Sequence, residues 1–234
     1  MPARSNLAMQ GLVSIGFALA LLLAGPGRAW GQLVLYQKLP DHNFGYSSDT
    51  TYLNDAGQGS AQIVADSFAL ASGGSVCGVN WWGFYGGTFG LDPGPPAGDE
   101  TMRVRFYENA AGLPGAVLAE HTFLNPTRVS TGAFVGGSET LRREYRFQAA
   151  LPSCFAAAAG VTYWFEAQQV GEINSRFRWE TSSQGDNRFA TRFPVDTDWR
   201  ISNQPDDLSF RLLTPEPTGG LLMLLALIGA ARSK

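Results

Sequence analysis

The chain has 234 residues, a formal net charge of −3 and only 16% charged residues. A weakly acidic chain offers no strongly basic surface, which argues against nucleic acid as a partner. Its 28 glycines and 12% aromatic residues favour an extracellular β-protein with many turns over a helical cytosolic enzyme.

The first 31 residues have the pattern of a secretory signal peptide. Arg4 supplies a positive start, and residues 12–24 form an apolar core of the expected length. Ala29 and Gly31 are the small residues that a signal-peptidase site requires, so Gln32 is the expected start of the mature chain. A transmembrane anchor is the alternative, but the apolar stretch is short for a span and is followed by Gly-Pro-Gly.

Residues 32–213 carry the pattern of about ten short β-strands separated by turn residues. The alternation is clearest at Met102, Val104 and Phe106, whose side chains are predicted to point inward. A short alanine-rich run at 155–159 is the one helical signal in this part. The pattern predicts a single all-β domain, an antiparallel β-sandwich that is jelly-roll-like. The predicted strands are 33–37, 62–70, 76–85, 101–108, 116–123, 141–147, 162–168, 176–181, 188–193 and 207–213.

The strand at 76–85 is the most apolar and contains two adjacent tryptophans, Trp81 and Trp82. Side chains alternate along a strand, so the two rings must point to opposite faces of the sheet. Cys77 is expected on the face of Trp81, and Val76 on the face of Trp82. One tryptophan is therefore predicted in the core, and the other under a loop or against a partner.

The mature region has two cysteines, Cys77 and Cys154. In an exported chain such a pair most simply forms a disulfide. Closing so long a loop stabilises a fold by up to about 4 kcal/mol in the chain-entropy model. The alternative is two buried free thiols, because spacing in the sequence does not prove proximity. The sequence has no CxxC, HExxH or Cys/His cluster, which argues against a structural zinc site.

The C-terminal end differs in character from the rest of the chain. Pro215, Glu216 and Pro217 form a Pro-Glu-Pro triplet, and an apolar run at 219–231 and Arg232 follow it. Prolines fix φ and remove backbone donors, so the triplet is predicted to be extended. The Leu-rich run is typical of a short membrane-inserting helix that ends in positive charge. A final core helix is the alternative, but a proline linker and the end of a chain are unusual places for one.

This order of triplet, apolar helix and basic end resembles the PEP-CTERM sorting tail of exported bacterial proteins. The resemblance implies a tail at 214–234 that holds the chain transiently in the inner membrane. An exosortase and the export machinery would be its partners, and the cell surface or extracellular matrix its destination. The apolar run is shorter than a typical span, and Arg232 with Lys234 stands where the family usually has several arginines. The stretch 76–118 also looks like β-sandwich ectodomains that often accompany such tails.

Residues suited to catalysis are few. His42 and His121 are the chain's two histidines, and no GxSxG motif marks an esterase nucleophile. We therefore expect no catalytic residues. The alternative is a secreted carbohydrate-active hydrolase in which Glu166 and Glu180 act as paired carboxylates beside aromatic residues. That chemistry depends on their separation in space, which the sequence does not give.

The expected role is that of a non-catalytic surface or matrix component that binds extracellular polysaccharide. Sugar rings stack on exposed aromatic faces, and Trp82, Trp164 and Trp179 are the candidates for such contacts. Core packing is the competing explanation, because sandwich cores routinely bury tryptophans. No cofactor is expected. If a metal ion is bound, calcium is favoured, because loop aspartates supply hard oxygen ligands: Asp41, Asp49, Asp55, Asp196, Asp198, Asp206 and Asp207.

Overall fold

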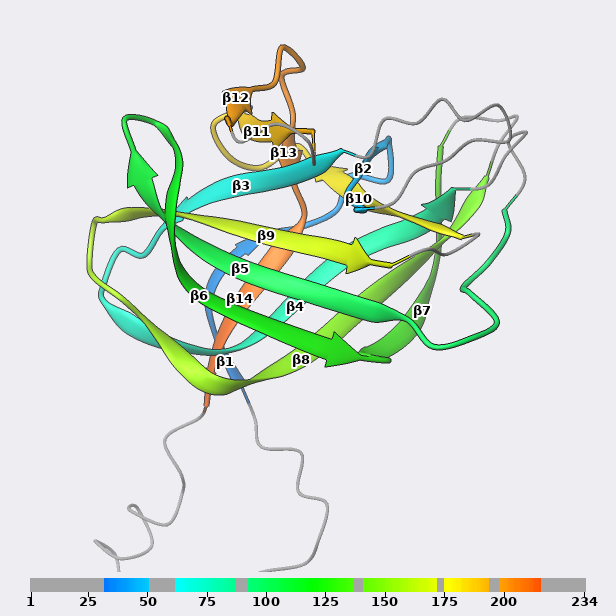
Figure 1. Ribbon diagram of the computed structural model, residues 1–234, viewed down its shortest axis with the longest axis horizontal. Helices are drawn as coiled ribbons and strands as arrows, with labels where there is room; N and C mark the ends of the chain where they lie inside the picture. Colours follow the sequence, from blue (N-terminus) through cyan, green and yellow to red (C-terminus); the bar gives the residue numbers. More distant parts are fainter. Residues whose placement is uncertain are drawn as a thin grey trace, which may run out of the picture. The chain divides into compact units, whose positions relative to one another are not determined.

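Two antiparallel β-sheets that face each other make up the part of the chain that the computed structural model describes (Figure 1). The described residues are 32–50, 62–86, 92–136, 141–171, 175–193 and 198–215. Within them there is no helix, and so none of the length and apolar character needed to cross a membrane. The predicted all-β antiparallel sandwich is confirmed. The predicted signal peptide and the apolar helix of the tail lie outside the described residues.

In the described residues, one sheet has eight strands and is centred on β4, which pairs with β8, β14 and β10. Beyond these, β1 continues the sheet next to β14 and β7 next to β8, while β2 and β13 pair with β10. The eight strands are β1 (Gln32–Lys38), β2 (Gly45–Ser47), β4 (Gly74–Gly86), β7 (Thr127–Val135), β8 (Arg142–Ala157), β10 (Arg176–Ser182), β13 (Asp207–Leu208) and β14 (Phe210–Pro215).

The other sheet has six strands in the described residues, in the order β12-β11-β3-β9-β5-β6. Its longest pairing joins β5 and β6 in a hairpin. The turn of this hairpin is at Ala111 and Gly112, which both have positive φ. The six strands are β3 (Ile63–Ala69), β5 (Thr101–Ala110), β6 (Leu113–Leu124), β9 (Thr162–Val170), β11 (Phe189–Arg192) and β12 (Arg200–Ile201).

Aromatic side chains from both sheets fill the core. Trp81 of β4 stacks on Phe147 of β8 with ring centroids 5.3 Å apart. Between the sheets, Phe165 of β9 meets Trp179 of β10 edge to face at 5.5 Å. Such pairs add about 0.5–1.5 kcal/mol each beyond the area they bury. Alternation of large apolar residues along the strands therefore produces one continuous core between the two sheets.

A β-bulge in the pairing of β4 with β8 reverses the faces predicted for Val76 and Cys77. The pairing of β4 with β8 shifts between Val76 and Gly78, and a bulge of this kind interrupts the strict alternation of side chains. Val76 is buried in the core, whereas Cys77 is partly exposed. Beyond the bulge the prediction is correct: Trp81 is a core residue and Trp82 points away from the core.

Four segments differ from the predicted strands. The strands β2, β7 and β12 were not predicted, because β2 and β12 have only three and two residues and β7 is mostly exposed. The alanine-rich run at 155–159 is not helical. Its first part continues β8, where Phe155 and Ala157 are buried and Ala156 is exposed. That is the alternation of a strand.

Cys77 of β4 and Cys154 of β8 form the predicted disulfide. The described part of the chain therefore has no free thiol. The bond spans the irregular stretch of the β4–β8 pairing, where backbone hydrogen bonds between the two strands are interrupted.

The two ends of the described domain are neighbours. β1 and β14 pair along their length, and Gln32 lies opposite Pro215. Pro215 is thus the last residue of the last strand, two residues beyond the predicted end of the sandwich at 213. A proline is acceptable there, because a strand end can do without one backbone donor. The chain enters and leaves the sandwich at one place (Figure 1).

Candidate functional site

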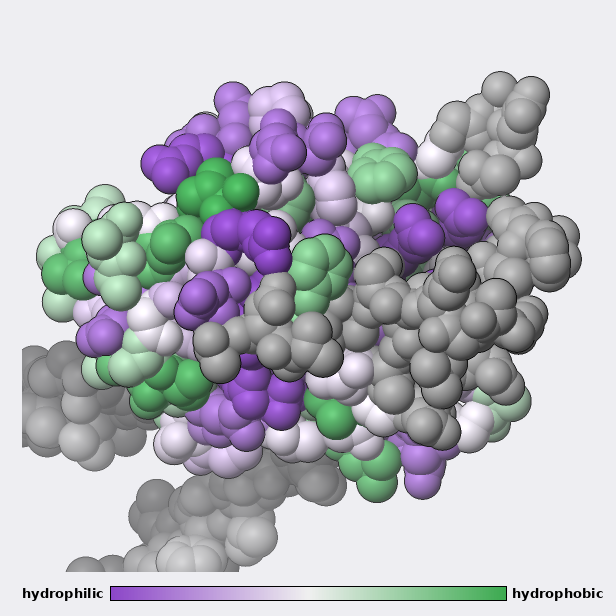
Figure 2. Space-filling view, turned by 45° about the horizontal axis from the view of Figure 1, so that its top comes forward, coloured by the Kyte–Doolittle hydropathy of each residue, from purple (hydrophilic) through white to green (hydrophobic). Residues whose placement is uncertain are grey.

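In the coloured part of Figure 2, hydrophilic residues are mixed with separate apolar patches. We call the face of the eight-stranded sheet that points away from the core the outer face. On β4 it carries Asn80 and Trp82, since Val79 and Trp81 point into the core. Their pairing partners place further polar residues beside them.

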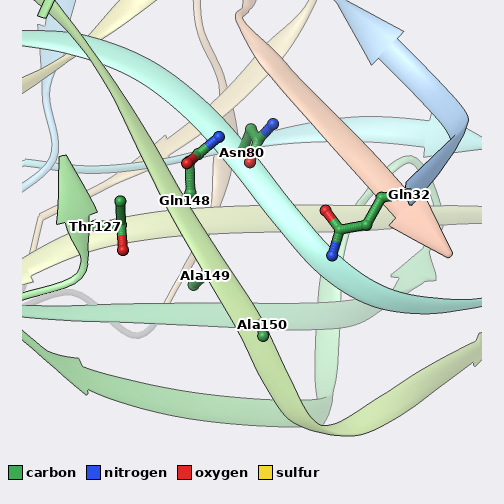
Figure 3. Close-up of a pocket in the computed structure, with 6 residues that line it drawn as sticks. All are labelled: Gln32, Asn80, Thr127, Gln148, Ala149 and Ala150. Atoms are coloured by element: carbon green, nitrogen blue, oxygen red, sulfur yellow. The ribbon is translucent and has the colours of Figure 1, made fainter. Parts of the chain in front are cut away.

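A pocket of about 220 Å³ lies on the outer face where β1, β4, β7 and β8 meet. Asn80 and Gln148 lie opposite each other on β4 and β8, with Gln32 to one side and Thr127 to the other (Figure 3). Gly78 makes room for this arrangement, because a Cβ there would lie 2.9 Å from Nε2 of Gln32. We call these four polar residues, with Ala149 and Ala150, the amide pocket. Its polar side chains carry amide and hydroxyl groups and no net charge.

Arginines flank the amide pocket on the same face. Arg146 pairs with Trp82, and Arg211 pairs with Asn80. The guanidinium of Arg211 lies 5.5 Å from the centroid of the Trp82 ring. Burial, and after it the charge of Arg146, lower the pKa of Arg211. Two like charges held together in this way create a site that favours an anion.

A second group of arginines continues along the outer face. Arg178 lies opposite Phe84, and the guanidinium of Arg142 lies 5.7 Å from the Phe84 ring. Burial and the neighbouring Arg142 and Arg176 lower the pKa of Arg178. In the described part of the chain, six arginine Nε atoms are buried without a hydrogen-bond partner, and four of them belong to the arginines of these two groups: Arg142, Arg146, Arg178 and Arg211.

Residues 30–216 match the model of a protein family described as a domain of unknown function, DUF7901. The chain belongs to this family. No curated protein matches the chain. The match covers the whole described sandwich, so the outer face and the disulfide are both parts of the DUF7901 domain.

The three tryptophans proposed for sugar stacking are buried in the DUF7901 domain. Trp82 is 5% exposed beneath Arg211, and Trp164 is 3% exposed. Trp179 is fully buried and donates a hydrogen bond from Nε1 to the carbonyl of Ser209. None of the three presents an open ring face. Core packing accounts for Trp179, and a covering guanidinium for Trp82, so a sugar site in this domain must rest on other residues.

The two carboxylates proposed for hydrolysis lie in different sheets, Glu166 on β9 and Glu180 on β10. Both are fully buried. Glu166 accepts a hydrogen bond from the hydroxyl of Tyr107 and lies near Arg105. Burial raises the pKa of Glu166, although these neighbours act against the rise. The two acids do not flank a common cleft, which paired-carboxylate hydrolysis requires.

Glu180 is instead paired with Glu144, a residue that the sequence analysis did not single out. Nδ1 of His42 lies 2.7 Å from Glu144 Oε2 and 3.1 Å from Glu180 Oε1. Burial and the neighbouring Glu144 raise the pKa of Glu180 far above its usual value. Glu180 is therefore protonated at neutral pH. An imidazole with two carboxylates is also a donor set for a divalent transition metal.

The aspartates of the calcium prediction do not gather in one group among the described residues. Oδ1 of Asp41 accepts hydrogen bonds from Asn43 N and from the hydroxyl of Thr181. Asp206 accepts from the hydroxyl of Tyr46, and Asp49 is buried elsewhere. Asp198 is exposed, Asp207 contacts Lys38, and Asp55 and Asp196 lie outside the described residues.

The predicted sorting motif begins at the last residue of the described domain. Pro215 closes β14, while Glu216, Pro217 and Arg232 lie outside the described residues. The amide pocket had no signal in the sequence, because its residues come from four strands that are distant along the chain.

Proposed function

We propose that this protein is an exported, non-catalytic component of the cell surface or extracellular matrix that binds extracellular polysaccharide through its outer face. The amide pocket is the observation that carries the proposal. Amide and hydroxyl groups both donate and accept hydrogen bonds, as the hydroxyl groups of a sugar do. Four such side chains converge there from separate strands.

The arginines extend the site toward an acidic polysaccharide. Arg146 lies on β8, the strand of Gln148, and Arg211 lies on β14 opposite Asn80. Their guanidinium groups suit the carboxylates of uronic acids. A chain of sugars in the pocket would pass over them. Binding is therefore expected to weaken with salt, because part of the attraction is electrostatic.

The export route is part of the same proposal. Residues 1–31 would act as a signal peptide, and residues 214–234 as a PEP-CTERM-like tail with a short membrane helix. An exosortase would recognise Pro215, Glu216 and Pro217. The disulfide supports an oxidising compartment, where such bonds persist. Because β1 and β14 are paired, anchoring at either end would hold the domain by the same point.

Cosedimentation of the purified protein with acidic and neutral polysaccharides tests the binding site. The Asn80→Ala/Gln148→Ala variant is expected to lose most of its binding, since it removes two of the converging amides. The Asn203→Ala/Gln204→Ala variant is the matched control, because it removes the same two groups from an exposed loop. Near-UV circular dichroism checks that both variants keep their tertiary packing. Equal binding by the two variants would overturn the assignment to the amide pocket.

A further inference from the structure

A buried lysine lies between the two sheets. The amine of Lys38, on β1, is 2.9 Å from both carboxylate oxygens of Asp66, on β3. It also contacts Oδ1 of Asp207, on β13. Lys38 is 2% exposed, and both aspartates are fully buried. One cation thus faces two carboxylates, and all three side chains are almost fully buried.

Lysine is an unusual choice for this position. Lys38 and Lys234 are the chain's two lysines, and the other basic residues that carry a permanent charge are arginines. Arginine is the usual residue for buried ion pairs, because its guanidinium forms planar paired hydrogen bonds. A lysine amine differs in that it can lose its proton and act as a nucleophile, which a guanidinium does not do in proteins.

The charges of the site determine which of its groups hold protons. Burial raises the pKa of Asp66 to about 7, so this carboxyl can take up and release a proton near neutral pH. Burial also acts to lower the pKa of Lys38, but the two carboxylates outweigh it and hold that pKa above its usual value. The amine must therefore pass a proton to a neighbour before it can react, and Asp66 lies within hydrogen-bond distance.

We propose that Lys38 and Asp207 condense into an intramolecular isopeptide bond, with Asp66 carrying the protons between them. This modification goes beyond the proposed binding function. It would join β1, the first strand of the domain, to the segment that leads into β14, the last. Groups held in contact in this way react as if at a very high effective concentration.

The reaction needs no oxidant and no co-reactant. Asp66 first carries a proton from Nζ to Oδ1 of Asp207, which leaves a neutral amine and a neutral carboxylic acid. Nζ then attacks Cγ of Asp207, and the Nζ–Cγ bond forms. Asp66 carries a second proton from Nζ to Oδ1, the Cγ–Oδ1 bond breaks, and one water leaves. An ammonium and a carboxylate become an amide and a water, and Asp66 ends as it began.

The hydrogen bonds of the two aspartates indicate that the carboxyl of Asp207 is the one that reacts. Both oxygens of Asp66 accept from backbone groups, Oδ1 from Ser67 N at 2.6 Å and Oδ2 from Leu208 N at 2.7 Å. Asp66 is thus fixed as a proton carrier. In Asp207, Oδ2 accepts from Asn187 N at 2.7 Å, and this donor would stabilise the oxyanion of the tetrahedral intermediate. Oδ1 faces the amine and is the oxygen that departs.

The surroundings suit the departure of water. A pocket of about 360 Å³ opens beside the amine and is lined in part by Tyr36, Lys38 and Asp186. Gly185 lies against the carboxyl of Asp207, and a Cβ at this position would collide with it. The site therefore has an exit for the released water and close packing around the reacting carbon.

Peptide mass spectrometry of the purified full chain tests the proposal. After reduction of the disulfide and digestion with chymotrypsin, the peptides that contain Lys38 and Asp207 are expected as one linked species, lighter than their sum by one water. Amine labelling of the unfolded chain gives a second readout. Lys234 should be labelled fully, as an internal control, and Lys38 should remain unlabelled.

Three variants separate the roles of the residues. Lys38→Arg keeps the charge but has no amine, so the linked species is expected to vanish. Asp207→Ala is expected to restore complete labelling of Lys38 in the unfolded chain. Asp66→Asn keeps both reacting groups and should lower the yield of the link at least tenfold.

Other results would overturn the proposal or part of it. Separate Lys38 and Asp207 peptides at their sequence masses, with Lys38 labelled in the wild-type chain, would mean that the site is an ion pair only. A link from Lys38 to Asp66 would overturn the assignment to Asp207. An unchanged yield in Asp66→Asn would remove Asp66 from the reaction. The wild-type result alone decides whether the bond exists, even if a variant fails to fold.

Discussion

At the scale of single residues, the pair of Glu144 and Glu180 makes the stability of this protein depend on pH. Burial and the neighbouring carboxyl raise the pKa of Glu180 in the folded state above its ordinary value of 4.5. Between these two pKa values the folded state binds more protons than the unfolded state, so the free energy of unfolding falls as pH rises. The pair therefore stabilises the fold most at acid pH.

The Glu180→Gln variant is expected to flatten this dependence. A glutamine keeps the shape and stays neutral, so stability should fall less between about pH 5 and pH 9 than in the wild type. Urea unfolding at several pH values measures the effect. Glu120→Gln is the control, because Glu120 is exposed on β6, where it pairs with Arg105 at the surface. If Glu180→Gln and wild type lose stability equally as pH rises, Glu180 does not titrate as described.

Gly185 provides a second test at the residue scale. Its φ is +139°, and a Cβ would collide with the carboxyl of Asp207. Gly185→Ala is expected to lower the free energy of unfolding by about 2 kcal/mol or more, from backbone strain together with the collision. Gly132→Ala is the matched control, because Gly132 has a φ of +84° but open space around it. Thermal unfolding compares the two, and an equal loss would show that the contact with Asp207 contributes nothing.

At the scale of elements, alternation of residues predicted most strands of the core but not their irregularities. The strand β5 was predicted correctly, with Met102, Val104 and Phe106 inward, because residues 101–106 follow the period of two. The bulge at Cys77 has no mark in the composition, so the faces of Cys77 and Val76 could not be predicted. The exposed strand β7 has no strong pattern of buried positions and was missed for that reason.

For the candidate sites too, part could be predicted from the sequence and part could not. Tryptophans and acids were selected by residue type, and burial decided their place: Trp179 is in the core, and Glu180 pairs with Glu144 rather than Glu166. The amide pocket depends on which strands become neighbours, and residue type alone does not encode that. Lys38 did have a signal in the sequence, since it is the sole lysine between residues 32 and 215.

The disulfide links two elements, because it joins β4 to β8 across the bulge. Replacing Cys77 and Cys154 together by serine is expected to lower the free energy of unfolding by about 2–5 kcal/mol, because the unfolded chain gains conformational entropy. Guanidinium unfolding with and without reductant measures this loss. Reductant should destabilise the wild type and leave the double variant unchanged. Equal transition midpoints for the oxidised wild type and the double variant would contradict a stabilising role.

At the scale of the whole molecule, the pairing of β1 with β14 determines how the domain can be attached. Gln32 and Pro215 lie opposite each other, so the segments before and after the domain start from one place. Removing the tail after Pro215 would leave the sheet pairing intact. A sorting enzyme could therefore release the domain without unfolding it, which is what a surface or matrix destination requires.

The proposed tail is tested by the fate of the C-terminus. In a host with an exosortase, the surface fraction of the wild-type protein is expected to lack Lys234, as mass spectrometry of its C-terminal peptide would show. Glu216→Ala/Pro217→Ala should keep Lys234 and stay with the membrane, whereas the neighbouring Thr218→Ala should behave as wild type. An intact Lys234 end on wild-type protein at the surface would exclude cutting. Because the triplet begins at the last residue of β14, cutting after it leaves every described strand in place, so processed and unprocessed protein should unfold at the same temperature.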